Sequence, residues 1–175
     1  MSDRELLRRK AARVLVVDAA DRLLLLRGVD PATPDRPFWF TVGGGLEPGE
    51  SPRAGAVREL HEETGLVVGE EALVGPVYSD ESAFAFDRWW IEQSNDFFAV
   101  RVRDTRVRPA ALETTEVASI QASAWWTLEE LRAHAGGRPN EGPGRPGETV
   151  YPEGLADVLE TALVALRDVP HHGLA

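Results

Sequence analysis

The chain has 175 residues, which suits one domain with its own hydrophobic core and is short for two full domains. Its formal net charge of -10 at pH 7 repels polymeric nucleic acid and anionic membranes, so neither is expected as a partner. The sequence contains no cysteine, which excludes a disulfide framework, a zinc–thiolate site and a thiol nucleophile. It has no bilayer-length apolar run and no secretion signal, so we expect a cytoplasmic protein.

The N-terminal quarter of the chain is predicted to form three strands. Apolar runs over residues 13–19 and 23–29 flank a short polar break, a pattern that predicts an antiparallel hairpin with largely buried strands. Residues 30–37 contain three prolines and are expected to form a loop. The aromatic and β-branched residues 38–42 predict a short strand, which three glycines end before a loop that runs to Glu50.

The clearest predicted helix follows this loop. Ser51 is a favoured N-cap, and Pro52 fits the first helical position, where its missing N–H costs nothing. The residues after it are mostly good helix formers, and Gly65 is a typical C-terminal stop. We therefore expect a helix that begins at Pro52 and ends just before Gly65.

The rest of the chain is predicted to add strands and two more helices. Gly and Pro crowd the stretch 135–150, which is expected to be a flexible loop, and residues 168–175 are expected to be a tail. Strands interleaved with a few helices favour an α/β fold with a mixed sheet and helices on both faces. The expected strands cover residues 66–68, 73–78, 83–91, 97–102 and 122–126, with a turn at 94–96, and the expected helices cover residues 128–134, after Thr127, and 155–166.

Three glutamates lie on one face of the predicted helix that begins at Pro52. At about 100° per residue, Glu59, Glu62 and Glu63 fall within a sector of about 100°. Leu60 falls on a separate face that can pack on the sheet. One short helix is thus expected to bury one side and to present three carboxylates on another.

This acidic face is unfavourable for a helix without a ligand. Like charges one turn apart repel each other, and the helix dipole disfavours negative charge in the last turn, where Glu62 and Glu63 lie. A hard divalent cation reverses this balance, because carboxylate oxygens are its preferred ligands, and Mg²⁺ fits best. Arg58 lies one turn before Glu62 and can orient a carboxylate. The alternative is an acidic face that is simply solvated.

The residues from Gly44 to Leu66 resemble the Nudix box, G-x5-E-x7-R-E-U-x-E-E-x-G-U, where U is aliphatic, and every fixed position matches. The resemblance implies a single Nudix domain over residues 1–175, with the α/β/α sandwich of that family. The matching residues are Gly44, Glu50, Arg58, Glu59, Leu60, Glu62, Glu63, Gly65 and Leu66.

The resemblance also implies a reaction and a set of site residues. The family hydrolyses a nucleoside diphosphate linked to another moiety, with Mg²⁺ as the cofactor and Mn²⁺ as a possible substitute. The alternative function is a catalytically silent Nudix module that binds a nucleotide or metabolite as a sensor, and the intact glutamates argue against it. The implied metal ligands are Glu59, Glu62, Glu63 and the Gly43 carbonyl, supported by Gly44, Glu50 and Arg58, and the implied catalytic carboxylates are Glu62, Glu63 and Glu116, with Glu113 as the alternative to Glu116.

The residues of the Nudix box do not indicate which substrate the protein takes. Sequence patterns of the substrate subfamilies are mostly absent, so only a small nucleotide-type molecule is expected. Phe40, Arg88 and Trp90 are candidates for substrate contacts, because aromatic rings stack on bases and arginine binds phosphate. The alternative is that these aromatic residues belong to the core or to the interface of a homodimer formed by the tryptophan-rich strands.

Overall fold

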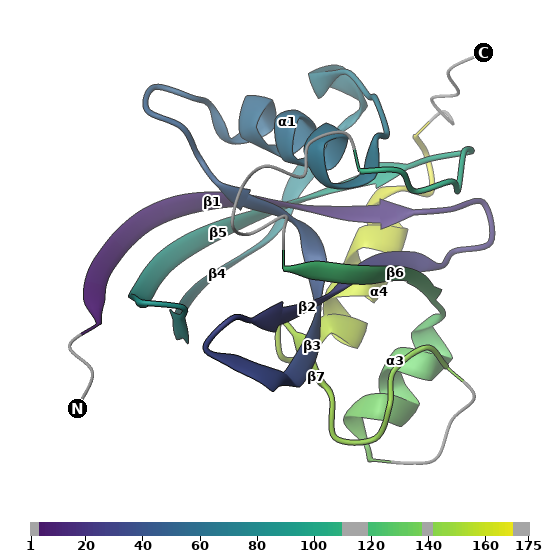
Figure 1. Cartoon of the computed structure of the whole chain (residues 1–175). Helices are drawn as coiled ribbons and strands as arrows, with labels where there is room; N and C mark the ends of the chain where they lie inside the picture. The colour runs from purple at the N-terminus through teal and green to yellow at the C-terminus, as the bar shows by residue number, and fades with distance from the viewer. Residues whose placement is uncertain (1–3, 110–118, 138–141, 170–175) are drawn as a thin grey trace.

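The structure, a computed structural model, describes residues 4–109, 119–137 and 142–169. Within these ranges, seven strands form one mixed sheet that carries helices on both faces (Figure 1), which confirms the predicted α/β sandwich. None of the helices described is long and apolar enough to cross a membrane. The strands are β1 (Glu5–Val17), β2 (Leu23–Asp30), β3 (Thr33–Gly45), β4 (Val74–Phe86), β5 (Trp89–Arg101), β6 (Ile120–Trp126) and β7 (Thr149–Tyr151), and the helices are α1 (Pro52–Thr64), α3 (Leu128–Ala135), α4 (Leu155–Ala165) and a 3-10 turn (Glu70–Ala72).

The sheet has a hydrophobic core on each face. Successive side chains of a strand point to opposite faces, so Val14 packs in the core that contains Leu60 of α1, whereas Leu15 packs in the core that contains Leu159 of α4. All four of these side chains are fully buried. This two-sided burial explains why the central strands are apolar throughout instead of alternating apolar and polar residues.

Strand β3 changes partner along its length, so that its three glycines, Gly43 to Gly45, pair with β1. Its first half pairs with β2, as in Gly28↔Phe38, whereas its second half pairs with β1, as in Ala11↔Gly45. Strands β1 and β2 are antiparallel and largely buried, as predicted, but they share only the register pair Val17↔Leu23, next to the turn that joins them. Both runs are apolar on both faces, which suits central strands that take their partners from elsewhere in the chain.

Two predicted loops are strands in the structure. The predicted loop over residues 30–37 is wrong. Only residues 31 and 32 separate β2 from β3, which already begins at Thr33. The pairing with β2 shifts between Gly28 and Asp30, so the prolines of β3 lie where the ladder is irregular. The glycines Gly43–Gly45 also continue β3 instead of starting a loop.

The predicted turn at residues 94–96 is wrong as well. These residues lie inside β5, and the chain turns instead at Asp87 and Arg88, which divides the single strand predicted over residues 83–91 between β4 and β5. The Asn95 side chain donates to the Asp80 carboxylate (2.7 Å) and to the Ser82 hydroxyl (3.1 Å), so polar residues typical of turns here satisfy one another across two strands. The short strand predicted over residues 66–68 is not formed.

The remaining elements follow the predictions closely. Helix α1 begins and ends as predicted, β6 covers the expected strand, and α3 follows Thr127, whose side chain forms a capping box with Glu130. Helix α4 covers all but the last residue of the expected stretch. The end of the loop predicted over residues 135–150 is ordered instead. Glu148 is buried there, and the next residue, Thr149, begins β7.

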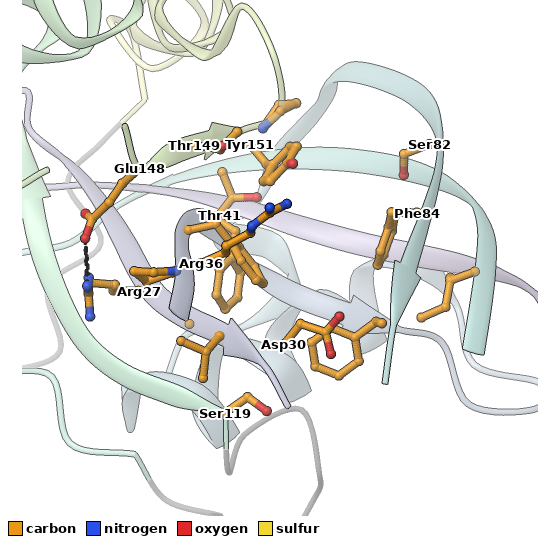
Figure 2. A pocket seen from close by; sticks show the side chains of 18 of the residues that line it. Arg27, Asp30, Arg36, Thr41, Ser82, Phe84, Ser119, Glu148, Thr149 and Tyr151 are labelled. Carbon is orange, nitrogen blue, oxygen red and sulfur yellow. Dashed lines mark hydrogen bonds and ion pairs between the residues drawn. The ribbon is translucent and has the colours of Figure 1, made fainter. Parts of the chain in front are cut away.

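The sheet and the segment that contains β7 enclose a pocket of about 900 Å³ (Figure 2). One wall comes from β3 and includes Phe38 and Phe40, and another comes from β4 and includes Ser82 and Phe84. Glu63 of α1 and Gly43 of β3 also line the pocket. Helix α1 therefore borders this pocket through Glu63.

Candidate active site

Helix α1 is fixed at both ends by local interactions. The Ser51 hydroxyl accepts a hydrogen bond from the Ala54 amide (3.1 Å), and Gly65, at φ 74°, donates its amide to the His61 carbonyl (2.8 Å). Glu59 and Glu63 are only 7% and 3% exposed, because they face the glycine end of β3. A merely solvated acidic face therefore does not describe these two residues.

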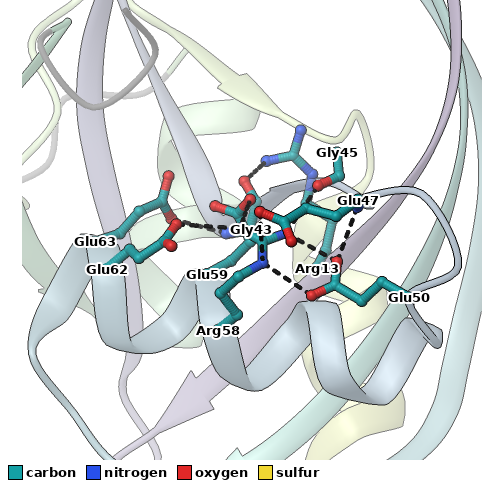
Figure 3. Close-up of polar contacts among 9 residues, drawn as sticks. All are labelled: Arg13, Gly43, Gly45, Glu47, Glu50, Arg58, Glu59, Glu62 and Glu63. Atoms are coloured by element: carbon teal, nitrogen blue, oxygen red, sulfur yellow. Dashed lines mark hydrogen bonds and ion pairs between the residues drawn. The ribbon is translucent and has the colours of Figure 1, made fainter. Parts of the chain in front are cut away.

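The glycines of β3 allow this close approach of helix and strand. Glu63 accepts a hydrogen bond from the Gly43 amide (2.8 Å), as Figure 3 shows. A Cβ atom added to Gly44 would lie 2.8 to 3.0 Å from the carboxylate of Glu59, so any side chain at this position would displace that carboxylate. The Gly43 carbonyl accepts a hydrogen bond from Arg13 (2.5 Å), which orients this oxygen beside the carboxylates.

Arg58 connects the acidic residues of the site (Figure 3). Its Nε and Nη2 donate to the two oxygens of Glu50 (2.9 Å each), and Nη2 also donates to the Gly45 carbonyl (3.0 Å). Its Nη1 donates to Glu59 (2.9 Å) and Glu62 (3.1 Å). The hydrogen bonds from Arg58 hold the pKa of Glu50 below its usual value, and those to Glu50 and then Glu59 raise the pKa of Arg58.

The donor set of this site fits a hard divalent cation by its chemistry. Three carboxylates on one helix and an adjacent backbone carbonyl supply only oxygen ligands, which Mg²⁺ prefers. Glu59 and Glu62 both contact one nitrogen of Arg58, so Arg58 supplies the positive charge for these two carboxylates in the present conformation. Over the ranges that the structure covers, no three acidic or histidine side chains converge on a single point.

Of the other predicted site residues, the structure places only Phe40 at the pocket. Phe40 lines the pocket, whereas Arg88 and Trp90 lie near the β4–β5 turn and are not among the residues that line it. The Arg88 guanidinium instead covers the ring of Trp89, 4.9 Å from its centroid. Glu113 and Glu116 lie outside the described residues.

Glu148 is a buried residue of the pocket wall that the sequence did not indicate. Its Oε1 accepts hydrogen bonds from Nη2 (2.6 Å) and Nε (3.1 Å) of Arg27, and its Oε2 accepts from the indole of Trp39 (2.7 Å) and the amide of Arg145 (3.1 Å). Its backbone carbonyl contacts Nε2 of His134 (2.7 Å). These contacts fix the end of the 142–148 stretch against β2 and β3.

A family model for the NUDIX domain matches residues 7–145, which is most of the chain. The chain belongs to the Nudix family. The match includes α1, its glutamates and the glycine end of β3. Glu148, β7 and α4 lie after the matched range, so this Nudix chain closes part of its pocket with residues beyond the family match.

Individual relatives agree with this assignment. A Bacillus subtilis (strain 168) protein named "Putative 8-oxo-dGTP diphosphatase" is 35% identical over 81 residues, which are 44% of this chain and 51% of the relative. The chain thus matches about half the length of that relative. A MutT protein from Methanosarcina mazei Go1 has a TM-score of 0.57 at 18% identity, covering 92% of this chain and 96% of the other. A C. elegans Ap4A hydrolase has a TM-score of 0.55 at 17% identity, covering 90% and 97%. The two structures share the fold.

The hydrogen bonds of Glu148 are expected to make the stability of this Nudix domain depend on pH. Burial raises the pKa of Glu148, but hydrogen bonds from Arg27, the Arg145 amide and Trp39 together lower it below its usual 4.5. A carboxyl whose pKa is lowered by folding stabilises the fold above its unfolded pKa, and this contribution is lost as the pH falls below that value. We expect Glu148→Gln to lower the free energy of unfolding by about 2 to 4 kcal/mol at pH 7.

Urea unfolding at pH 7 and at pH 3.5 measures this effect. The difference between wild type and Glu148→Gln should shrink at the lower pH, because the carboxyl of the unfolded chain is protonated there and the ionised carboxylate then contributes less to folding. Glu153→Gln, the same chemical change at an exposed position five residues away, is the control and should unfold like wild type at both pH values. A Glu148→Gln deficit of equal size at both pH values would contradict the role of the ionised carboxylate.

Proposed function

We propose that this Nudix chain is a metal-dependent hydrolase that cleaves a diphosphate linkage in a nucleoside diphosphate joined to another moiety. The observation that carries the proposal is the arrangement of Glu59, Glu62 and Glu63 on one helix beside the glycines of β3, with Glu63 lining the pocket. Mg²⁺ is the proposed cation, and Mn²⁺ is a possible substitute. The pairwise contacts of Arg58 support the proposal, because they hold Glu50 and two of the glutamates in fixed positions.

Each residue of the site has a proposed part in the reaction. Glu59, Glu62 and Glu63 would hold the cation, which when bound neutralises phosphate charge and lowers the pKa of bound water. Glu62 is the best candidate to accept the proton of the attacking water, because 29% of its side chain is exposed, compared with 10% for Glu59. Glu116 is the proposed alternative base.

The pocket lining carries five arginines, five carboxylates and several aromatic rings, and we propose that the arginines and the rings bind a phosphate-containing substrate with a flat apolar part. Arginine pairs well with phosphate oxygens, and aromatic rings stack on bases. The Bacillus subtilis relative is named for a nucleotide substrate, which supports the nucleotide class for this chain. The arginines that line the pocket are Arg9, Arg13, Arg27, Arg36 and Arg145, and the aromatic residues that line it are Phe38, Phe40, Phe84, Phe86, Phe97 and Tyr151.

Removal of divalent metal is expected to abolish the activity. The purified protein should turn over at least one member of a panel of nucleoside triphosphates, nucleotide sugars, ADP-ribose and dinucleoside polyphosphates when Mg²⁺ is present. After dialysis against EDTA, turnover should fall to background, and added Mg²⁺ should restore it, as measured by chromatography of the nucleotide products. Undiminished turnover in EDTA would contradict the metal requirement, and tight binding without any product would indicate a sensor module instead.

We also propose that the chain forms a homodimer through its tryptophan-rich strands. Leu6 of β1 and Trp90 of β5 are register partners in the sheet, and they are 49% and 41% exposed. Adjacent apolar side chains that remain exposed are typical of a surface that contacts another protein. This feature lies away from the pocket lining, so the proposal is independent of the reaction.

A further inference from the structure

A chain of polar side chains crosses strands β1, β5 and β4 beside the pocket. Nε of Arg9 donates to Oε1 of Gln93 (3.0 Å), and Nε2 of Gln93 donates to Oδ1 of Asn95 (2.7 Å). Nδ2 of Asn95 then donates to Oδ1 of Asp80 (2.7 Å) and to the Ser82 hydroxyl (3.1 Å). These five residues form a polar chain, and all of them except Gln93 line the pocket.

The polar chain interrupts a buried and otherwise apolar face of β5. On this face, Gln93 and Asn95 lie between Ile91 and Phe97, and all four side chains are buried. Buried amide groups cost free energy unless each finds a hydrogen-bond partner, whereas apolar side chains carry no such cost. Packing alone would be satisfied by apolar residues at positions 93 and 95, so the polar chain points to a role in the pocket.

The two ends of the polar chain fix the direction of every hydrogen bond within it. Arg9 can only donate and the Asp80 carboxylate can only accept, so each amide between them accepts on the Arg9 side and donates on the Asp80 side. Both N–H groups of the Asn95 amide are thereby used. Within the described part of the chain, Oδ2 of Asp80 accepts no hydrogen bond and the Ser82 hydroxyl donates none. The polar chain therefore ends on β4 with one acceptor and one donor that a ligand can use.

This acceptor and donor match the hydroxyl groups of a sugar. A hydroxyl can donate to the Asp80 carboxylate and accept from the Ser82 hydroxyl, and a hydrogen bond to a carboxylate is stronger than one between neutral groups. Asp80 and Ser82 share one nitrogen of Asn95 as their donor, so they lie close enough to serve a single hydroxyl or two adjacent ones. Figure 2 shows Ser82 on the opposite side of the pocket from Thr149 and Tyr151, so this subsite is separate from β7.

The other end of the polar chain lies near the glutamates of α1. A Cβ atom added to Gly45 would lie 3.1 Å from Nη1 of Arg9, so Arg9 lies against the glycine end of β3, which borders those glutamates. Arg9, Gln93 and Ser82 are register partners on three adjacent strands. The backbones of Arg9 and Ser82 are thus two strand spacings apart, about 10 Å. A diphosphate held at the glutamates would place the hydroxyls of an attached sugar within this range.

We propose that Asp80 and Ser82 form a subsite for the sugar hydroxyls of the substrate, and that Asn95 is the positioning residue that orients both. The inference rests on the proposed function for the position of the diphosphate. It predicts that the protein distinguishes nucleotides by the hydroxyls of their sugar, and that it does so through binding affinity.

Binding is tested by calorimetry with Mg²⁺ in the Glu62→Gln background, so that turnover does not interfere. The ligands are the four common ribonucleoside triphosphates, the 2′,3′-dideoxy analogue of each, which lacks both sugar hydroxyls, and inorganic tripolyphosphate. The parent protein should bind its preferred ribonucleotide about tenfold more tightly than the dideoxy analogue, because a hydrogen bond to a charged group contributes about that much. Asp80→Asn keeps an acceptor for Asn95 but loses the charge, so it should reduce this ratio to about twofold and leave tripolyphosphate binding unchanged.

Two further variants separate recognition from structure. Glu81→Gln makes the corresponding change at the next residue of β4, which is exposed and points to the opposite face of the strand, so it should leave the ratio unchanged. Asn95→Ala removes the donor to both Asp80 and Ser82, so it should reduce the ratio as Asp80→Asn does. A merely structural role of Asn95 would lower the number of binding sites per protein chain and leave the ratio of affinities unchanged.

The outcomes separate this inference from the proposed function. Equal affinity of the parent protein for the ribonucleotide and its dideoxy analogue, or a ratio that Asp80→Asn leaves intact, would overturn the subsite even if the protein hydrolyses nucleotides. A ratio that Asp80→Asn removes, in a protein that hydrolyses nothing, would support the subsite and overturn the hydrolase. Failure of the parent protein to bind any of the nucleotides would overturn both.

Discussion

Glu62→Gln is expected to lower kcat by about 100- to 10,000-fold while leaving the Tm within about 2 °C of wild type. The activity falls because glutamine lacks the negative charge that would bind a divalent cation and cannot accept a proton as a carboxylate does. The fold should persist because the side chain is partly exposed, and its hydrogen-bond partner is Nη1 of Arg58, to which a glutamine oxygen can also accept. Initial rates with the best substrate of the panel and a thermal melt measure the two quantities.

A matched variant separates loss of this carboxylate from a general loss of acidic charge. Glu71→Gln makes the same change at an exposed residue of the 3-10 turn that follows α1, so it should keep full activity. Glu62→Gln that turns over substrate as fast as wild type would remove the glutamate helix from the mechanism. The buried Glu63 is less suitable for this purpose, because it also accepts the Gly43 amide and its replacement would disturb the contact between helix and strand.

The glutamate helix could be predicted because its determinants are local. The N-cap at Ser51, the stop at Gly65 and the angular positions of the carboxylates all lie within fifteen residues, and each follows from the geometry of a single helix. The sequence also predicted that Arg58 would orient one carboxylate. In the structure Arg58 donates hydrogen bonds to three carboxylates, because the loop before the helix folds back and brings Glu50 to the guanidinium that also contacts Glu59 and Glu62.

The path of the strands could not be predicted from local patterns in the same way. The runs 13–19 and 23–29 are apolar on both faces, so nothing in their sequence distinguishes a hairpin paired along its whole length from one paired only next to its turn, with other partners beyond it. The polar residues 94–96 resemble a turn, and only their cross-strand partners on β4 make them suitable for a strand interior. In both cases the missing information is the identity of a partner that lies far away in the sequence.

Glu148 shows the same limit within the pocket. It lies in a stretch rich in Gly and Pro, and its ion-pair partner Arg27 is 121 residues away, so the sequence alone suggests an exposed loop acid. Burial and four side-chain hydrogen bonds become visible only when β7 is placed beside β3. Local sequence thus specifies the glutamate helix at one side of the pocket, whereas long-range pairing specifies the wall that contains Glu148.

Gly43→Ala is expected to be the most destabilising of the single changes considered, with a loss of about 2 to 6 kcal/mol in the free energy of unfolding. Gly43 has φ 126°, a conformation that residues with a side chain rarely adopt. An added Cβ would lie only 2.1 Å from the Ala12 carbonyl oxygen on β1. Gly43 is in register with Arg13 on that strand, so the clash can be relieved only by moving paired backbone.

Gly49→Ala separates the two causes of this loss. Gly49 also has a positive φ, 78°, but an added Cβ there meets nothing within 4 Å, so its replacement carries backbone strain of about 1 to 2 kcal/mol and no clash. Urea unfolding measures the loss of unfolding free energy in each variant. The loss for Gly43→Ala minus the loss for Gly49→Ala is the cost of the clash between β3 and β1. Equal losses would mean that β3 can move away from β1 without penalty. In that case the Gly43 amide could not hold Glu63 in a fixed position, and the site would need another source of its geometry.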